Sequence, residues 1–296
     1  MEAIDRRALV VGVDGSPAGK EALRWALDAA ARRRAGVRVV HALELSLFDV
    51  RLDAAYGPGW ETPLRTSMRQ MLDEIVADAA RSHPDVTVET RLEAAPASVI
   101  LVEESERADT VVLGKRGTGG FANLVIGSTT LHVATNAHCP VVAVPTAPAA
   151  GPARRGVVVG VDGTPAAEPV IEYAFRAADE AGEPLMAVHT WRDPAPMGPG
   201  VMMPLVYDPT LVTFEERLLL SEMMAGWSQK YPDVEVQQTV LHAHAVPSLV
   251  EEARAARLLV VGCRRRGDLK SLLLGSVSHG VLHRACGPVA VVPRTG

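Results

Sequence analysis

The segment "LVVGVDGSP", residues 9–17, recurs as "VVVGVDGTP" at residues 157–165, an offset of 148 positions (162 − 14). The same offset relates His41 to His189, Gly114 to Gly262, Gly127-Ser128 to Gly275-Ser276 and Pro140-Val141 to Pro288-Val289. A constant offset across a whole half indicates two copies of one domain rather than a short-period solenoid. We therefore predict domains at residues 1–148 and 149–296, joined by the Pro-, Ala- and Gly-rich linker 145–156.

Composition narrows the class of protein. The chain has 296 residues, 48% apolar and 22% charged, which is typical of a globular protein with more than one domain. A net charge of −5 argues against nucleic-acid binding. No apolar run approaches the ~18 residues that cross a bilayer, and the N-terminus does not resemble a signal peptide. Cys139, Cys263 and Cys286 show no CxxC spacing, so we expect reduced thiols and a cytoplasmic location.

Strand-like and helix-like segments alternate through each half. Ser16 is a candidate N-cap, with Pro17 at the first helical position. Alternation of this kind predicts a parallel sheet with helices on both faces, and ligands in such sheets bind at the carboxyl ends of the strands. In the first half we expect strands at 8–13, 37–43, 86–92, 110–114 and 140–144, and helices at 18–34, 64–81, 97–107 and 128–137.

An aspartate ends the first strand of each half. Asp14 and Asp162 both precede a Gly-Ser/Thr-Pro turn. Such a turn favours Asp for purely local reasons. Alternatively, the carboxylate accepts hydrogen bonds from the base or ribose of a ligand. The sequence leaves both interpretations open.

A glycine-rich loop follows the fourth strand, in "VVLGKRGTGGFANLVIGSTTLHVA", residues 111–134. Its glycines are Gly114, Gly117, Gly119 and Gly120, and Gly127-Ser128-Thr129-Thr130 then open a helix. Backbone N–H groups, hydroxyls and the positive end of the helix dipole would converge there, and Lys115 and Arg116 add positive charge. Gly114 and Gly117 would let the backbone approach a ligand. The loop is not a Walker loop, because the chain has no Gly-Lys-Ser/Thr, and a simple mobile connection is the alternative.

The second half departs from this pattern. Arg265 stands where the first half has Gly117, which matters if the position needs a positive φ or close backbone approach. Gly267 could restore flexibility two residues later. The arginines 264–266 could grip phosphate, or they form a solvated basic turn. We expect the first site to bind at least as tightly as the second.

Other chemistry is weakly indicated. His279 and His283 have metal-capable spacing, but no Glu follows His279, so we predict no metal site. No Gly-x-Ser-x-Gly elbow holds a nucleophile, so we predict no catalytic residues. Cys263 is expected inside the second candidate loop, either as a redox-sensitive thiol or as inert packing.

The spacing Gly114-x2-Gly117-x9-Gly127-Ser128, joined to "VGVDGSP", resembles the ATP-binding branch of the universal stress protein family. The resemblance covers nearly the whole chain, and the tandem form is similar to dormancy-associated actinobacterial members. It implies two Rossmann-like α/β domains, each a five-stranded parallel sheet of order 3-2-1-4-5. It also implies ATP phosphates on the loop and adenosine near the Asp. The implied contacts are Gly12, Asp14, Ala42, Leu113, Gly114, Gly117, Gly127, Ser128, Thr129 and Thr130 in the first half, and Gly160, Asp162, Thr190, Val261, Gly262, Arg265, Gly275, Ser276, Val277 and Ser278 in the second.

The resemblance predicts a cytoplasmic stress or dormancy regulator that binds ATP without turning it over. It also implies a homodimer, or pairing of the two domains, through the fifth strands. A regulatory protein partner and magnesium beside the nucleotide stay open. The alternatives are a structural stress protein that works through partners, and a slow ATPase or adenylating enzyme of the adenine-nucleotide α-hydrolase group.

Overall fold

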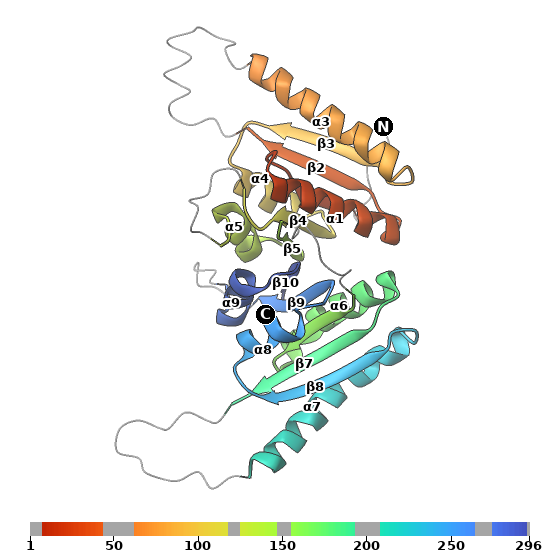
Figure 1. Ribbon diagram of the computed structural model, residues 1–296, viewed down its shortest axis with the longest axis vertical. Coiled ribbons are helices and arrows are strands. Elements are labelled where there is room, and N and C mark those ends of the chain that lie inside the picture. The colour runs from red at the N-terminus through yellow and green to blue at the C-terminus, as the bar shows by residue number, and fades with distance from the viewer. Residues whose placement is uncertain are drawn as a thin grey trace, which may run out of the picture. The chain divides into compact units, whose positions relative to one another are not determined.

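Short valine-rich strands alternate with longer helices along the chain, as the computed structural model shows for residues 8–43, 62–117, 125–146, 155–192, 208–263 and 274–294 (Figure 1). The chain divides into two compact units, Met1–Gly151 and Pro152–Gly296, named unit 1 and unit 2 below. This division falls inside the predicted linker 145–156. No helix among the described residues is long and apolar enough to cross a membrane.

Unit 1 is built on a parallel sheet of strand order β3-β2-β1-β4-β5. Strand β1 lies at its centre, where Leu9 and Val11 are fully buried. Both faces of the strand are covered, so the sequence is continuously apolar rather than alternating. The elements are β1 Leu9–Gly12, α1 Pro17–Arg33, β2 Val37–Ala42, α3 Thr62–Ser82, β3 Val88–Glu93, α4 Ala97–Glu104, β4 Thr110–Gly114, α5 Ser128–Asn136 and β5 Val141–Val144.

Unit 2 repeats the arrangement, with strand order β8-β7-β6-β9-β10 and every pair parallel. The predicted α/β class and the order 3-2-1-4-5 are therefore confirmed in both units. The elements are β6 Val157–Val161, the 3-10 turn η1 Pro165–Ala167, α6 Glu168–Ala181, β7 Leu185–Trp191, α7 Pro209–Lys230, β8 Val236–His242, α8 Ala245–Glu252, β9 Leu258–Cys263, α9 Ser276–Arg284 and β10 Val289–Pro293.

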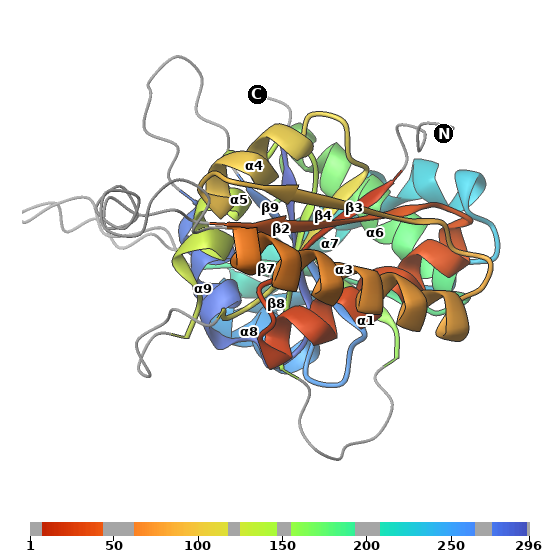
Figure 2. The ribbon, with the colours of Figure 1, turned by 90° about the horizontal axis from the view of Figure 1, so that it is seen from above.

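Helices cover both faces of each sheet. In unit 1, α1 packs on β1 and β4 and α3 packs on β3, while α4 and α5 pack on each other and on the sheet. Figure 2 shows α4 on one side of β2 and β3 and α3 on the other. In unit 2, α6 and α7 pack together, and so do α8 and α9. The carboxyl ends of the strands are left as the edge where each sheet can meet a ligand.

The first helix starts differently in the two units. In unit 1, Ser16 caps α1: its Oγ accepts a hydrogen bond from Gly19 N at 3.0 Å, as the sequence predicts. In unit 2, Thr164 makes no such cap, residues Pro165–Ala167 form a 3-10 turn, and α6 begins only at Glu168.

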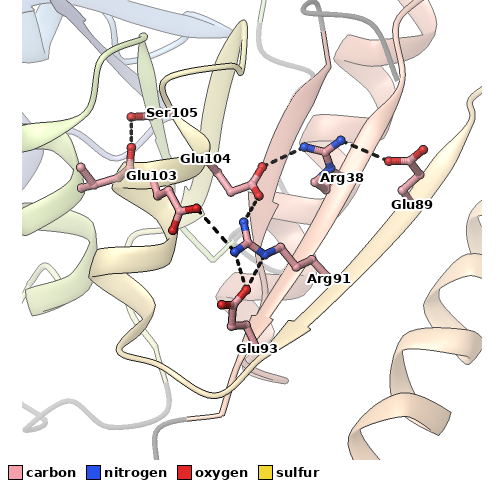
Figure 3. A network of polar contacts seen from close by, with 8 residues as sticks. Arg38, Glu89, Arg91, Glu93, Glu103, Glu104 and Ser105 are labelled. Atoms are coloured by element: carbon pink, nitrogen blue, oxygen red, sulfur yellow. Dashed lines mark hydrogen bonds and ion pairs between the residues drawn. The ribbon is translucent and has the colours of Figure 1, made fainter. Parts of the chain in front are cut away.

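A charged network joins β2, β3 and α4 in unit 1 (Figure 3). The Glu104 side chain is 6% exposed and accepts hydrogen bonds from Arg38, at 3.0 Å, and from Arg91. Arg38 also pairs with Glu89, and Arg91 with Glu93. At the positions of unit 2 that correspond to Arg38, Glu89, Arg91 and Glu93, the chain has Met186, Gln237, Thr239 and Leu241. The equivalent network is therefore absent from these strands of unit 2.

Candidate functional site

Asp14 and the loop after β4 meet at the carboxyl end of the unit 1 sheet. Asp14 is exposed, and its Oδ1 accepts a hydrogen bond from Ser16 N at 3.0 Å. A Cβ on Gly117 would lie 2.5 Å from Asp14 Oδ2. Gly117 does not have a positive φ. Of the two reasons the sequence left open, close approach is therefore the one that applies, and the group approached is Asp14.

Gly114 is needed for packing against α1. A Cβ there would lie 2.7 Å from the backbone carbon of Ala18 in α1. Gly12 also lies against a neighbouring side chain, because a Cβ added there would lie 2.5 Å from Leu113 Cδ2. Packing alone therefore requires glycine at position 114, and the approach of the Gly114 backbone to a ligand stays a prediction. Gly12, Leu113 and Gly114 can offer a ligand only backbone groups.

The start of α5 lies beside the same strand end. Gly127 N donates to Lys115 O at 2.8 Å, and Thr130 Oγ1 donates to Gly114 O at 2.8 Å. These bonds join the helix start to the end of β4. Thr130 is buried, Thr129 is half-buried and Ser128 is exposed, whereas Lys115 is buried and only Arg116 of the two predicted cations is exposed.

A histidine joins the ends of β1 and β2. His41 is buried, and its Nδ1 donates to Val13 O at 2.7 Å, immediately before Asp14. His189 makes the same bond to Val161 O at 2.8 Å. A carbonyl oxygen can only accept, so Nδ1 carries the proton in both. The recurrence of this histidine at the 148-residue offset was the signal in the sequence, and its role is to position the strand ends. Ala42, the next residue, ends β2.

Unit 2 places its predicted residues at the corresponding strand ends, with Gly160 in β6, Thr190 in β7, Val261 and Gly262 in β9, Gly275 before α9, and Ser276, Val277 and Ser278 in its first turn. The buried Ser278 hydroxyl donates to Gly275 O at 3.0 Å, within its own helix start. Arg265 lies outside the described residues, as do Gly119, Gly120 and Gly267.

Asp162 is held by groups of unit 2 itself. Its Oδ1 accepts from Thr164 Oγ1 at 2.8 Å and from Thr164 N at 3.3 Å. Its Oδ2 accepts from Arg294 Nη1 at 2.5 Å. Burial acts to raise the pKa of Asp162, but the hydrogen bonds from Arg294 and Thr164, with the arginine charge, lower it on balance. Asp162 is therefore an ionised partner of a buried arginine.

The sequence interpretation missed Arg294. This residue follows the last strand of unit 2, and its counterpart in unit 1 is Thr146 (294 − 148). The available signal was this break in an otherwise regular repeat, "VPT" in one half and "VPR" in the other. That break did not indicate that the side chain folds back across the strand ends.

Two other predicted features are placed by the structure. Cys263 is the last residue of β9 and is buried, so the prediction that it lies in the loop is wrong. The rings of His279 and His283 lie 4.5 Å apart between centroids. Within the described ranges, no group of three or more His, Cys, Asp or Glu side chains is arranged to hold a metal ion.

Two parallel α/β units, each with an aspartate and a helix start at the carboxyl end of its sheet, define a tandem protein of the Rossmann-like class. The model of the "Universal stress protein family" matches residues 6–145 and again 153–293, so the chain belongs to that family.

The relatives are of matching length. A universal stress protein of Mycolicibacterium smegmatis is 34% identical over 293 residues, covering 96% of each chain. Universal stress protein Rv2005c of Mycobacterium tuberculosis is 35% identical over 298 residues, covering 97% of each. The crystal structure of a universal stress protein from Archaeoglobus fulgidus has a TM-score of 0.71 at 18% identity, covering 98% of this chain and 97% of the other.

Nucleotides have been seen in shorter members of the family. One solved structure is the crystal structure of a universal stress protein in complex with cAMP, and another is the structure of the universal stress protein from Archaeoglobus fulgidus in complex with dAMP. They cover 47% and 48% of this chain, at 22% and 21% identity, with TM-scores of 0.36 and 0.35.

Proposed function

We propose that unit 1 binds ATP at the carboxyl ends of β1 and β4, and that the protein acts as a stress or dormancy regulator through this binding rather than through turnover. The nucleoside lies against Asp14, whose carboxylate accepts hydrogen bonds. The phosphates lie at the start of α5, where free backbone N–H groups, the exposed Ser128 and the helix dipole favour negative charge.

The geometry supports one continuous surface for such a ligand. Gly117 brings the β4 loop against Asp14, and the bonds from Gly127 and Thr130 fix α5 to the end of β4. Arg116 is exposed beside them and adds a charge suited to phosphate. The nucleoside and phosphate groups of one molecule would thus contact neighbouring segments of unit 1.

The main support for the proposal is that a glycine, Gly127, precedes α5 although the surrounding protein leaves room for a side chain. Gly127 has φ −72° and ψ 147°, which any residue can adopt, and it caps α5 without a side-chain hydrogen bond. A Cβ there would meet no described atom closer than 3.6 Å. The described part of the protein therefore does not itself require glycine at this helix start, where Ser, Thr, Asp or Asn is the usual cap. A ligand that needs the backbone N–H groups bare would require it.

The cytoplasm is the proposed compartment, because it supplies ATP and keeps Cys139, Cys263 and Cys286 reduced. We retain pairing of the fifth strands, within one chain or in a homodimer, as the proposed mode of assembly, because an apolar edge strand favours pairing. A regulatory protein partner would read the nucleotide state. Magnesium beside the phosphates is part of the same proposal.

Acid extraction of the purified protein, followed by liquid chromatography, tests the proposal directly. We expect ATP to be released in a fixed ratio to the chain. An extract without nucleotide, together with no binding of added ATP by calorimetry, would contradict it.

Alanine substitutions at Gly127 and at its counterpart Gly275 test where ATP binds. Gly127→Ala should weaken ATP binding roughly 5- to 150-fold, because the methyl group would occupy the space of a phosphate at a cost of about 1–3 kcal/mol. The melting temperature should not change, since the described residues around Gly127 leave room for the methyl group. Gly275→Ala, the corresponding change in unit 2, is the matched control and should leave the binding to unit 1 unchanged.

A further inference from the structure

Arg294 crosses the strand ends of unit 2. It follows β10, and its backbone N donates to Cys263 O, at the end of β9, at 3.2 Å. A Cβ on Gly262 would overlap Arg294 Nε and lie 3.0 Å from Arg294 Cζ, so the side chain runs directly over β9. Its Nη1 then reaches Asp162, after β6, at 2.5 Å. The Arg294 residue thus extends from the end of β10, across β9, to the end of β6. In this class of sheet, ligands bind beside the carboxyl ends of the two strands that correspond to β6 and β9.

The Arg294 side chain is buried at this position. It is 9% exposed, while the Asp162 side chain is 33% exposed. A charge-assisted hydrogen bond between such groups is strong because little water competes for either partner. Asp162 Oδ1 already accepts two hydrogen bonds from Thr164, so a neutral ribose hydroxyl that approaches the carboxylate competes with the Arg294 cation for Oδ2.

Unit 1 has a different arrangement at the same position. Thr146 is exposed and too short to reach across β4. The nearest atoms to a Cβ on Gly114 belong to Ala18 in the first turn of α1, whereas those near Gly262 belong to Arg294 and to Val170 in α6. Because α6 starts only after a 3-10 turn, Arg294 takes a place that the first helical turn takes in unit 1.

We infer that Arg294 closes the second nucleotide site by holding Asp162, so that the chain binds one nucleotide, in unit 1. This inference rests on the proposed function of unit 1. The residue at this position, threonine or arginine, decides which copy of the domain accepts the nucleoside. Arg294 is therefore a specificity-determining residue that acts from inside the protein.

Reciprocal exchange of the two residues in the full chain tests the inference. Wild type should bind about one ATP per chain in calorimetry, and Asp14→Ala should weaken that binding roughly 5- to 150-fold. Arg294→Thr in the Asp14→Ala background should restore about one ATP per chain, with affinity rising roughly 10- to 150-fold as the competing charged hydrogen bond is lost. Thr146→Arg alone should reduce ATP binding to unit 1. Arg284→Thr removes the same charge from the exposed last turn of α9 and should change nothing.

The exchange should be tolerated by the fold. Arg294 Nε is buried and has no hydrogen-bond partner among the described residues, so its removal leaves fewer unsatisfied donors. Melting curves check this, and Arg294→Gln, which keeps most of the side-chain length without the charge, gives a second opening variant. Thr146→Arg adds a test that leaves unit 2 unchanged.

The outcomes separate the two proposals. Wild type that binds about two ATP, or folded Arg294→Thr and Arg294→Gln that gain no binding, would overturn the closing role of Arg294. If wild type binds no ATP while Arg294→Thr binds about one, the role of unit 1 fails and the closing role of Arg294 stands. If neither protein binds ATP, both proposals fail.

Discussion

Asp14 and Asp162 occupy the same place in two copies of one fold, and their surroundings differ. Asp14 is exposed and lies against the backbone of Gly117, while Asp162 holds the buried Arg294. The strand order around them is the same, and so is the histidine hydrogen bond before each aspartate. The comparison teaches that strand order and loop position do not settle whether such a site can accept a ligand. By our inference, one side chain at the end of β10, two strands away from β6, decides it in unit 2.

The largest difference in stability should come from Glu104. Glu104→Ala would leave Arg38 and Arg91 without a buried carboxylate, and we expect unit 1 to lose about 3 kcal/mol, at the low end for a buried pair because both arginines are about a quarter exposed. Glu252→Ala, the matched change in unit 2, should cost less than about 0.5 kcal/mol, because Met186 and Thr239 replace the arginines. Urea unfolding of both variants measures the difference. Equal losses would show that the network does not distinguish the units.

The Glu104 contribution should also depend on pH. Burial acts to raise its pKa, but hydrogen bonds from Arg91 and Arg38 lower it on balance below its ordinary value of 4.5. A carboxyl with a lowered pKa in the folded state stabilises above its unfolded pKa, and this stabilisation is lost as the pH falls through the folded value. The gap in unfolding free energy between wild type and Glu104→Gln should therefore be constant near neutral pH and shrink below about pH 4.5. A gap as large at pH 3 as at pH 7 would contradict the assignment.

Gly117→Arg should produce the largest loss of binding. The new side chain would begin 2.5 Å from Asp14 Oδ2 and must push either the loop or the carboxylate away. We expect ATP affinity to fall about 100-fold, or about 2.7 kcal/mol. The substitution also gives unit 1 the residue that unit 2 has at this position, Arg265, without the Arg266-Gly267 that follows it in unit 2. Gly226→Arg adds the same charge on α7, where a Cβ meets nothing within 4 Å, and is the control. Unchanged affinity in Gly117→Arg would separate this loop from the site.

The two aspartates should respond in opposite ways to alanine. Asp14→Ala should weaken ATP binding roughly 5- to 150-fold, from the loss of about 1–3 kcal/mol of hydrogen bonding, with little loss of stability at an exposed strand end. Asp162→Ala should leave binding to unit 1 unchanged but lower the stability of unit 2 by about 1–3 kcal/mol, because Arg294 stays buried without its partner. Calorimetry and thermal melting of both variants give the two readouts. Wild-type affinity in Asp14→Ala would reduce this residue to a turn former.

The smallest expected effect concerns two thiols near the last strands. Burial raises the pKa of Cys139 to about 12, whereas Cys286 is exposed. At pH 8 roughly one Cys139 in ten thousand is a thiolate, and its burial also excludes reagents. A colorimetric thiol reagent should label the native chain rapidly at one position, and Cys286→Ser should remove that rapid phase. Rapid labelling of Cys139 would show that this end of unit 1 opens easily.

The fold was predictable because its information is local and repeated. The run "TVVLG" gave β4 with its observed bounds, and Ser16-Pro17 predicted the start of α1. The reason for Gly114 was not predictable, because a missing side chain looks the same whether a ligand or Ala18 fills the space. Arg294 was missed for a related reason. The predicted strand order already placed β10, β9 and β6 side by side, but spacing along the chain does not indicate that the Arg294 side chain turns back across their ends to Asp162.

In each unit, the central strand must wait during synthesis for one of its two neighbouring strands. Leu9 of β1 pairs with Thr110 of β4, and Val157 of β6 pairs with Leu258 of β9, so in both units 101 residues separate the partners (110 − 9 and 258 − 157). A ribosome that adds ~5–20 residues per second needs roughly 5–20 s to make that stretch. During this interval a newly made "LVVG" or "VVVGV" segment has one side without its native neighbour. Such an edge is prone to aggregate, and each unit should depend on chaperones most strongly before its fourth strand emerges.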